Sequence, residues 1–313
     1  MSYGVNIINM SFDDQCGSTT MGTYDNLCKY IDSIIEETEV SIVAVSGNTS
    51  YDVTSPGMSY NAITVGSFDD KNTTTINPCD DILSAFSGYW EDPAYYYRKH
   101  PEKPDILAPG QRITVSGLPD GIPTDGPYRV SSGTSFAAPQ VSGTLAQLMY
   151  VSNNLKYRPS LSKALINVSA KYKIDDSSFT VSGMDKYSDT EGAGKLSARN
   201  AAWVLASGRY KYYLGGTSTF PSSPSIPFTV LSSDQMIRVA LAWEKREGVD
   251  ISNLNLKVVT SDNTVVSSQS VYNNVEVIEF TLPELNLYGR GTYYIIIERN
   301  SGTGIEWLSV AWY

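Results

Sequence analysis

The segment Ser132–Pro139 carries residues that could do chemistry, because Ser135 stands between a glycine-containing strand end and the start of a predicted helix. A helix N-terminus presents unbonded N–H groups and partial positive charge, which favour an anion there. Ala137 and Ala138 are small enough for a substrate backbone to approach, and Pro139 falls near the helix start. These types suit a nucleophile whose attack creates an oxyanion. Serine is also a common helix N-cap, so this segment alone leaves a structural role open.

Asn48 is the second candidate, because it follows Ser46-Gly47 at the end of the apolar run Ser41–Val45. A strand end holds a side chain rigidly, and a carboxamide N–H is the kind of donor that an oxyanion needs. Loss of one such donor typically costs about 3–4 kcal/mol of transition-state stabilisation. By itself, Asn48 could equally be a turn residue in Gly-Asn-Thr.

Together with three further segments, these motifs resemble the subtilisin-like serine proteases. The resemblance implies that Ser135 is the nucleophile and that the Asn48 side chain donates to the oxyanion. The matching segments occur in the family's order: Ile7–Phe12, Ala44–Asn48, Ser55–Gly57 with Ala62–Gly66, Lys103–Gly110 and Gly133–Pro139.

The resemblance also implies a set of substrate-binding residues. The strand around residues 7–12 would pair with the backbone of a peptide or protein substrate and place Ser11 and Phe12 beside the residue that precedes the scissile bond. Gly57 would help to form the floor of the primary specificity pocket. The remaining substrate-binding candidates are Ser46, Gly47 and Thr134.

The family's triad runs in the order Asp, His, Ser, and this sequence has neither an Asp-Ser/Thr-Gly nor a His-Gly-Thr-His segment. Its only histidine, His100, lies in a charged, proline-flanked stretch that is typical of an exposed loop. We therefore expect the Asp and His in a missing N-terminal segment, and the chain alone to be close to inactive. An oxyanion hole and binding alone can still leave roughly 10³–10⁴-fold catalysis over water. Without that segment, the strand at 5–10 would be an exposed sheet edge.

Short apolar runs at 5–10, 41–45, 62–65 and 105–108 are predicted strands. They alternate with predicted helices, and in the first of these Tyr24, Leu27, Ile31, Ile34 and Ile35 recur at helical spacing. This order predicts an α/β fold, a three-layer parallel sheet with helices on both faces, which is an incomplete subtilisin-like domain over 1–208. The predicted helices cover 23–37, 135–151, about 161–170 and 196–206.

Helical periodicity stops near residue 210, where Pro221, Pro224 and Pro227 indicate a linker or domain entry. The alternating runs that follow predict an antiparallel β-sandwich, jelly-roll-like, over 209–313. This part resembles the C-terminal β-sandwich of some larger subtilisin-like proteases, through Val239–Trp243, Asn253–Lys257 and Gly291–Ile295.

Calcium is a possible cofactor, because Asp250, Asn253 and Asn255 could supply oxygen ligands. Loop and strand-edge positions are the favoured interpretation of these residues, since no EF-hand-like spacing is present. The three cysteines give no confident disulfide framework or zinc site. Free buried thiols are favoured, with a Cys16–Cys28 bridge as the alternative.

The composition is that of a globular chain, with 313 residues, 41% hydrophobic residues and a net charge of −10. This charge argues against nucleic acid and anionic membranes as partners. No run of 18 apolar residues predicts a membrane span. The N-terminus does not resemble a signal peptide, so an extracellular location is implied by the family alone.

We therefore expect a serine endopeptidase that works through an acyl-enzyme at Ser135. The alternative is a non-catalytic binding protein on the same scaffold, although that protein would have no need for both Ser135 and Asn48. An unrelated α/β hydrolase is set aside, because its Gly-x-Ser-x-Gly pattern is absent around Ser135.

Overall fold

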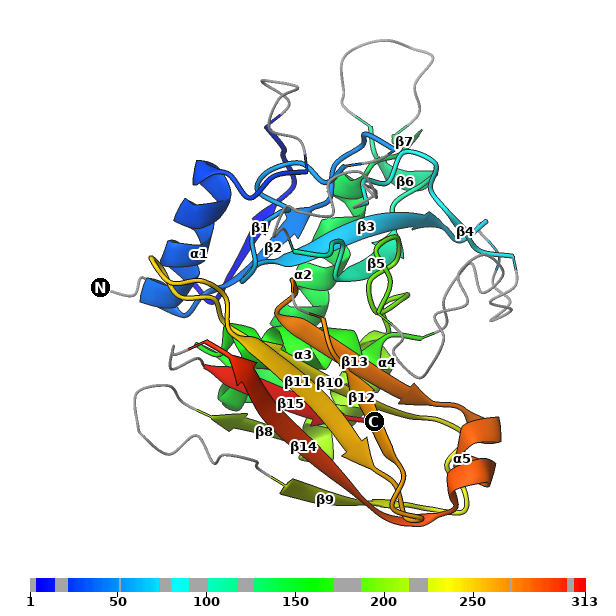
Figure 1. The fold of residues 1–313 in the computed structure, drawn as a ribbon. Helices are drawn as coiled ribbons and strands as arrows, with labels where there is room; N and C mark the ends of the chain where they lie inside the picture. Colours follow the sequence, from blue (N-terminus) through cyan, green and yellow to red (C-terminus); the bar gives the residue numbers. More distant parts are fainter. Residues whose placement is uncertain are drawn as a thin grey trace.

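The computed structural model has an α/β fold with several sheets, five α-helices among the described residues and a strand-rich C-terminal part (Figure 1). The predicted features at His100, Cys16, Pro221 and Pro224 lie outside the described residues. The structure describes residues 4–14, 22–50, 52–71, 73, 80–89, 101–117, 127–171, 187–213, 225–270, 272–302 and 307–313.

The N-terminal part is built on a five-stranded sheet. β1 pairs in parallel with β2, β2 with β3, and β3 with β5, whereas the two-residue strand β4 pairs antiparallel with β3. The predicted parallel strands are therefore present, and β1 lies at the end of the strand order. The strands are β1 (Ile7–Met10), β2 (Ser41–Val45), β3 (Ile63–Asp69), β4 (Ile82–Leu83) and β5 (Ile106–Pro109).

Helix α1 (Asn26–Thr38) covers one face of this sheet. Its N-cap Asp25 accepts a hydrogen bond from the backbone N–H of Cys28 at 2.9 Å, which satisfies one of the free donors of the first turn. Ile31 and Ile35 share a buried cluster with the β2 residues Ile42 and Ala44. Alternate residues of β2 thus face α1, as the pleat of a strand requires.

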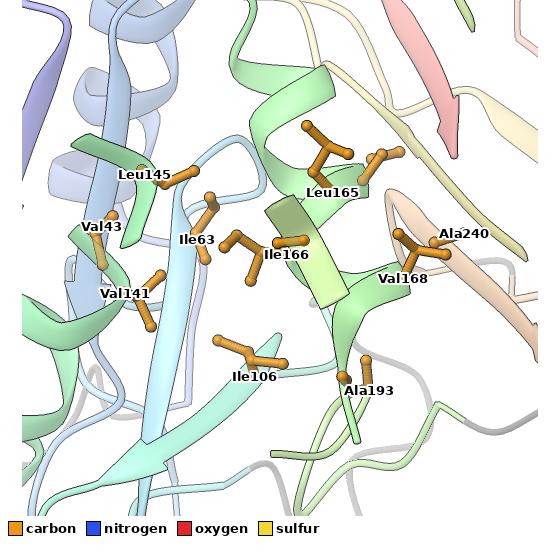
Figure 2. Packing of buried hydrophobic residues seen from close by; sticks show 14 of the residues in the cluster. Val43, Ile63, Ile106, Val141, Leu145, Leu165, Ile166, Val168, Ala193 and Ala240 are labelled. Atoms are coloured by element: carbon orange, nitrogen blue, oxygen red, sulfur yellow. The ribbon is translucent and has the colours of Figure 1, made fainter. Parts of the chain in front are cut away.

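Helix α2 (Thr134–Val151) contacts the strands from the opposite face. Val43 of β2 and Ile63 of β3 pack in one cluster with Val141 and Leu145 of this helix (Figure 2). All five residues of β2 are buried because the strand is covered on both faces, which explains its continuous apolar sequence.

Helix α3 (Pro159–Ser169) is buried along its entire length. It packs against strands of the C-terminal part as well as against the neighbouring helix α4 (Ala198–Ala206). Leu165 and Val168 share a cluster with Ala240 of a C-terminal strand (Figure 2). One apolar cluster therefore joins the N-terminal and C-terminal parts.

The C-terminal part contains two four-stranded antiparallel sheets, in the orders β13-β10-β15-β8 and β12-β11-β14-β9. A single buried cluster takes residues from both, including Val239 and Leu241 of one and Leu256 and Ile295 of the other. The strands are β8 (Tyr210–Tyr213), β9 (Ser225–Val230), β10 (Ile237–Trp243), β11 (Asn253–Val259), β12 (Val265–Ser268), β13 (Val275–Phe280), β14 (Gly291–Ser301) and β15 (Leu308–Trp312).

Two details differ from the sequence-based expectation. Pro227 lies within β9, opposite Tyr294, and not in a linker. β9 is an edge strand, where a residue without an N–H is tolerated. Leu282 begins helix α5 (Leu282–Tyr288), which the all-strand expectation for 209–313 does not include, because Thr281 and Glu284 form a capping box that starts a helix there.

Candidate active site

Ser135 is the second residue of α2, and the segment before it comes from a two-stranded sheet of β6 (Ile113–Ser116) and β7 (Tyr128–Ser131). The Ser135 hydroxyl is half-buried and donates to the carbonyl oxygen of Ser11 at 3.2 Å. The Ser11 hydroxyl donates back to the carbonyl oxygen of Ser135 at 3.1 Å. This reciprocal pair joins the start of α2 to the chain just after β1, so the predicted nucleophile and the predicted substrate-pairing segment meet.

The side chain of Asn48 lies against the same turn. Both the backbone N–H and the hydroxyl of Thr134 donate to its Oδ1, at 2.9 Å and 3.1 Å. An N–H can only donate, so the atom that it contacts must be the amide oxygen. The amide nitrogen Nδ2 is therefore the end of the side chain that is not bound to Thr134. It lies 3.4 Å from the position that a Cβ on Gly133 would occupy. Asn48 is exposed, so Nδ2 can donate to an atom outside the protein.

The backbone around Asn48 is held in place from two directions. Thr54 N–H donates to the carbonyl oxygen of Ser46 at 3.1 Å, and Gly88 N–H donates to that of Gly47 at 2.9 Å. Gly47 has a φ of 97°, and a Cβ there would lie 2.5 Å from Thr54 Oγ1. Only glycine suits this position, and the contacts fix the direction in which Asn48 leaves the strand.

The other predicted substrate-binding residues fall into two groups. Ser11 and Phe12 follow β1 beside Ser135, and the Phe12 side chain is 59% exposed, which suits contact with a substrate. Gly57 is buried, and a Cβ there would meet the carbonyl oxygen of Val45 at 2.4 Å. Close packing against β2 thus explains why position 57 is a glycine. The place of Gly57 in a specificity pocket stays a prediction.

Asn9 is a site residue that the sequence reasoning missed. Its Nδ2 donates to Ser11 Oγ at 2.7 Å, and its Oδ1 accepts from the hydroxyl of Ser142 on α2 at 2.9 Å. Asn9 thus ties β1 to α2 beside the reciprocal serine pair. A polar residue inside the otherwise apolar run Ile7–Met10 was the signal that could have found it.

The described residues include the predicted nucleophile Ser135 and the predicted oxyanion donor Asn48, but no general base in contact with the Ser135 hydroxyl. The partner of the Ser135 hydroxyl is a peptide carbonyl, which does not take up a proton at neutral pH. Within the described ranges there is no histidine, because His100 lies outside them. A serine hydroxyl needs an adjacent base to become a strong nucleophile, and the described residues place none beside Ser135.

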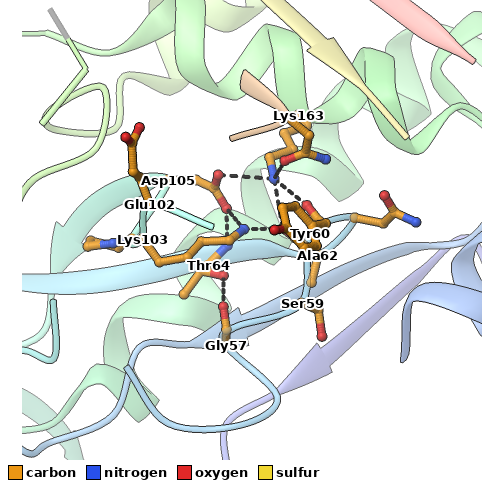
Figure 3. A network of polar contacts seen from close by, with 12 residues as sticks. Gly57, Ser59, Tyr60, Ala62, Thr64, Glu102, Lys103, Asp105 and Lys163 are labelled. Atoms are coloured by element: carbon orange, nitrogen blue, oxygen red, sulfur yellow. Dashed lines mark hydrogen bonds and ion pairs between the residues drawn. The ribbon is translucent and has the colours of Figure 1, made fainter. Parts of the chain in front are cut away.

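The matched segment Lys103–Gly110 contributes to a buried ionic network that links β3 to helix α3 (Figure 3). Lys103 Nζ lies 2.7 Å from Asp105 Oδ2, and Lys163 Nζ lies 3.0 Å from Asp105 Oδ1. Burial alone would raise the pKa of Asp105, but the two lysines hold it below its usual value. Burial lowers the pKa of Lys163. Lys163 also donates to Asn274 Oδ1 at 3.0 Å, which connects α3 to the C-terminal strands.

The predicted calcium ligands and one of the three cysteines lie within the described residues. No group of three or more His, Cys, Asp or Glu side chains in them is arranged to hold a metal ion. Asp250 and Asn253 line a cavity of about 860 Å³, and the buried carboxamide oxygens of Asn253 and Asn255 have no hydrogen-bond partner in the part of the chain that the structure describes. Cys28 is a free buried thiol, as expected, and burial raises its pKa to about 12.

Comparison with known proteins identifies the class of this protein. The profile of the subtilase family, Peptidase_S8, matches residues 2–200. The chain therefore belongs to the subtilase family, and the resemblance seen in the sequence is confirmed.

Among individual proteins, the chain is 32% identical over 168 residues to the serine protease AprX of Bacillus subtilis (strain 168). That match covers 50% of this chain and 33% of AprX, so the chain spans only about a third of that relative.

Similar solved structures include the prenylagaramide maturation protease PagA, at 27% identity and a TM-score of 0.46, covering 64% of this chain and 62% of PagA. The patellamide maturation protease PatA follows at 26% identity and a TM-score of 0.46, covering 65% of this chain and 64% of PatA.

Proposed function

We propose that this chain carries the nucleophile half of a serine endopeptidase that cleaves peptide bonds through an acyl-enzyme at Ser135. The observation that carries the proposal is the double hydrogen bond from Thr134 to Asn48 Oδ1. It fixes the amide of Asn48 with its oxygen at Thr134, the residue directly before Ser135, so that Nδ2 is left as the donor end. A preorganised donor of this kind stabilises charge only where charge develops, which is at the oxyanion.

In the proposed reaction, Ser135 Oγ attacks the carbonyl carbon of the scissile bond and its proton passes to a histidine. The carbonyl oxygen becomes an oxyanion that accepts a hydrogen bond from Asn48 Nδ2. The C–N bond then breaks, the amine leaves with the proton from the histidine, and water hydrolyses the resulting ester at Ser135. The peptide substrate would extend along Ser11 and Phe12.

The histidine and the aspartate that orients it would come from a segment outside this sequence. Support comes from β1, which pairs on one side with β2 and ends the strand order among the described residues. Such an edge has free N–H and C=O groups that a further strand could pair with. Without that segment, Ser135 has no base, and we expect this chain alone to be almost inactive.

The surrounding architecture is proposed on similar grounds. The subtilisin-like unit would cover 1–208, and the two C-terminal sheets, which share one buried cluster, would form a β-sandwich over 209–313. Among the described residues, no helix combines the length and apolar content needed to cross a bilayer. An extracellular location is proposed from the family.

Labelling with a fluorophosphonate tests the proposed function, because this reagent forms a covalent bond with activated serines. We expect slow labelling of the chain alone and rapid labelling of Ser135 once a segment with the Asp and His is supplied. Ser135→Ala should abolish the adduct, and Ser132→Ala is the matched control that should not. If Ser135 stays unreactive in the completed protein, the alternative of a non-catalytic peptide-binding protein is favoured.

A further inference from the structure

Asp13 lies two residues beyond Ser11, beside the proposed nucleophile. Two residues of extended chain span at most about 7 Å, and Ser11 itself accepts the hydrogen bond from Ser135 Oγ at 3.2 Å. The next residue, Asp14, donates its backbone N–H to the carbonyl oxygen of Ser55 at 2.9 Å. The segment 11–14 is thus anchored at one end to α2 and at the other to the turn that contains Thr54 and Ser55.

The Asp13 carboxylate contacts Thr54, whose side chain packs against Gly47, the residue before the proposed oxyanion donor Asn48. Thr54 Oγ1 donates to Asp13 Oδ2 at 3.3 Å, and the same Thr54 oxygen occupies the space where a Cβ on Gly47 would be. Gly47 directly precedes Asn48 in the chain. The Thr54 side chain therefore separates the Asp13 carboxylate from the backbone that leads into Asn48.

Among the described residues, Asp13 accepts a hydrogen bond from Thr54 but forms no ion pair. Its side chain is half-buried, not fully solvated. Nearby, the hydroxyl of Ser46 is fully buried and has no hydrogen-bond partner in the part of the chain that the structure describes. In the described part of the chain, this corner thus holds a carboxylate without an ion pair and a hydroxyl without a hydrogen-bond partner, close to the proposed nucleophile.

From this arrangement we propose that Asp13 selects substrates with a basic side chain, arginine or lysine, at the residue that precedes the scissile bond. The inference rests on the proposed function for the place of the peptide along Ser11 and Phe12. With that peptide in place, its carbonyl carbon would lie at Ser135 and the adjoining side chain would extend between residues 11–14 and the segments 46–50 and 52–57. A guanidinium or ammonium group there would meet the Asp13 carboxylate in a partly dehydrated setting, where an ion pair is stronger than in open water.

The test measures binding and needs no catalysis, so it is separate from the labelling of Ser135. Two fluorescent peptides, identical except for arginine or its neutral isostere citrulline at the one position, are titrated into the Ser135→Ala chain and followed by anisotropy. We expect the arginine peptide to bind about fivefold more tightly, which is the scale of a single partly exposed ion pair. Asp13→Asn should reduce this ratio to about one, and the matched control Asp14→Asn should leave it unchanged.

Reversal of the charge at position 13 should reverse the peptide preference, a result that loss of folding cannot produce. Asp13→Lys should bind a peptide with glutamate at the same position more tightly than one with arginine, and both preferences should shrink as salt rises. Equal binding of the arginine and citrulline peptides, no measurable binding of either, or an arginine preference that survives Asp13→Asn would overturn the inference. If the preference depends on Asp13 while Ser135 stays unlabelled in the completed protein, only the proposed catalysis fails.

Discussion

The corner around Ser135 and the buried network around Asp105 are both built from segments typical of the family, yet they use their polar groups in opposite ways. Asp105 contacts two lysines and also accepts from the backbone N–H of Thr64 at 2.7 Å, entirely out of reach of solvent. Asn48 uses its oxygen to hold one orientation and leaves its nitrogen exposed. A polar group with all its partners inside the protein stabilises the fold, whereas an amide held by its oxygen alone suits the donor role proposed for Asn48.

The largest effect is expected from breaking the buried network. Asp105→Ala leaves Lys103 and Lys163 buried without their carboxylate, and removal of one partner from a buried ion pair typically costs about 3–5 kcal/mol. Urea unfolding measures this loss. Glu37→Gln on the exposed face of α1 changes the net charge equally and should alter the free energy of unfolding by less than about 0.5 kcal/mol. A small effect of Asp105→Ala would show that the network is solvated.

A change at Asn48 should affect reactivity and spare stability. Asn48→Asp keeps an acceptor for the two Thr134 donors but removes the amide donor, so we expect acylation of Ser135 in the completed enzyme to fall by about 10²–10³-fold. The free energy of unfolding should change little. Stopped-flow acylation and urea unfolding on the same samples separate the two effects, and equal acylation rates would contradict the role of Asn48.

The pH dependence of stability should report on Glu244, which is buried at the N-terminus of α3, where the backbone N–H of Ser160 donates to it at 3.3 Å. Burial raises the pKa of Glu244 to about 8. The folded state then holds a proton that the unfolded state has lost, so this contribution is fully present below about pH 4.5 and disappears as pH rises to about 8.

Glu244→Gln should remove this pH-dependent component. Urea unfolding of both proteins between pH 5 and pH 9 measures it, with the wild type losing stability relative to the variant as pH rises. Parallel curves for the two proteins would show that Glu244 titrates normally.

The smallest effect is expected at Asn9, which connects Ser11 with Ser142. Asn9→Ala removes two hydrogen bonds at a partly solvated position and should cost about 1 kcal/mol in urea unfolding. Ser142→Ala removes only one of them and should cost less. If Asn9→Ala is silent in stability and in labelling of Ser135, the link between β1 and α2 depends on the serine pair alone.

Much of the fold could be predicted because the periodic apolar runs of the sequence coincide with the observed helices and strands. The run Ser41–Val45 matches β2 residue for residue, and the helix predicted at 135–151 begins one residue earlier as α2. Helix α5 was missed because seven residues are too few for a periodic signal, although Thr281 and Glu284 carried a capping pattern.

The candidate site was predictable only in part. Ser135 and Asn48 could be proposed from short motifs, and the structure brings both to one turn through Thr134. The contacts of Asp13 and Asn9 could not be predicted, because they depend on segments about 40 and 130 residues away in the chain, Thr54 and Ser142. Sequence motifs indicate which residues react, whereas long-range contacts decide what surrounds them.

Helix α3 has a consequence for any attempt to divide this protein. Strands β10, β13 and β15 of one C-terminal sheet cover one side of α3, and the N-terminal core covers the other. A cut near residue 208 would therefore expose an apolar side of α3 on the N-terminal piece and the apolar sheet face that packs on it on the C-terminal piece. We expect neither piece to fold stably on its own. Swapping C-terminal parts between relatives would require exchange of the helix face as well.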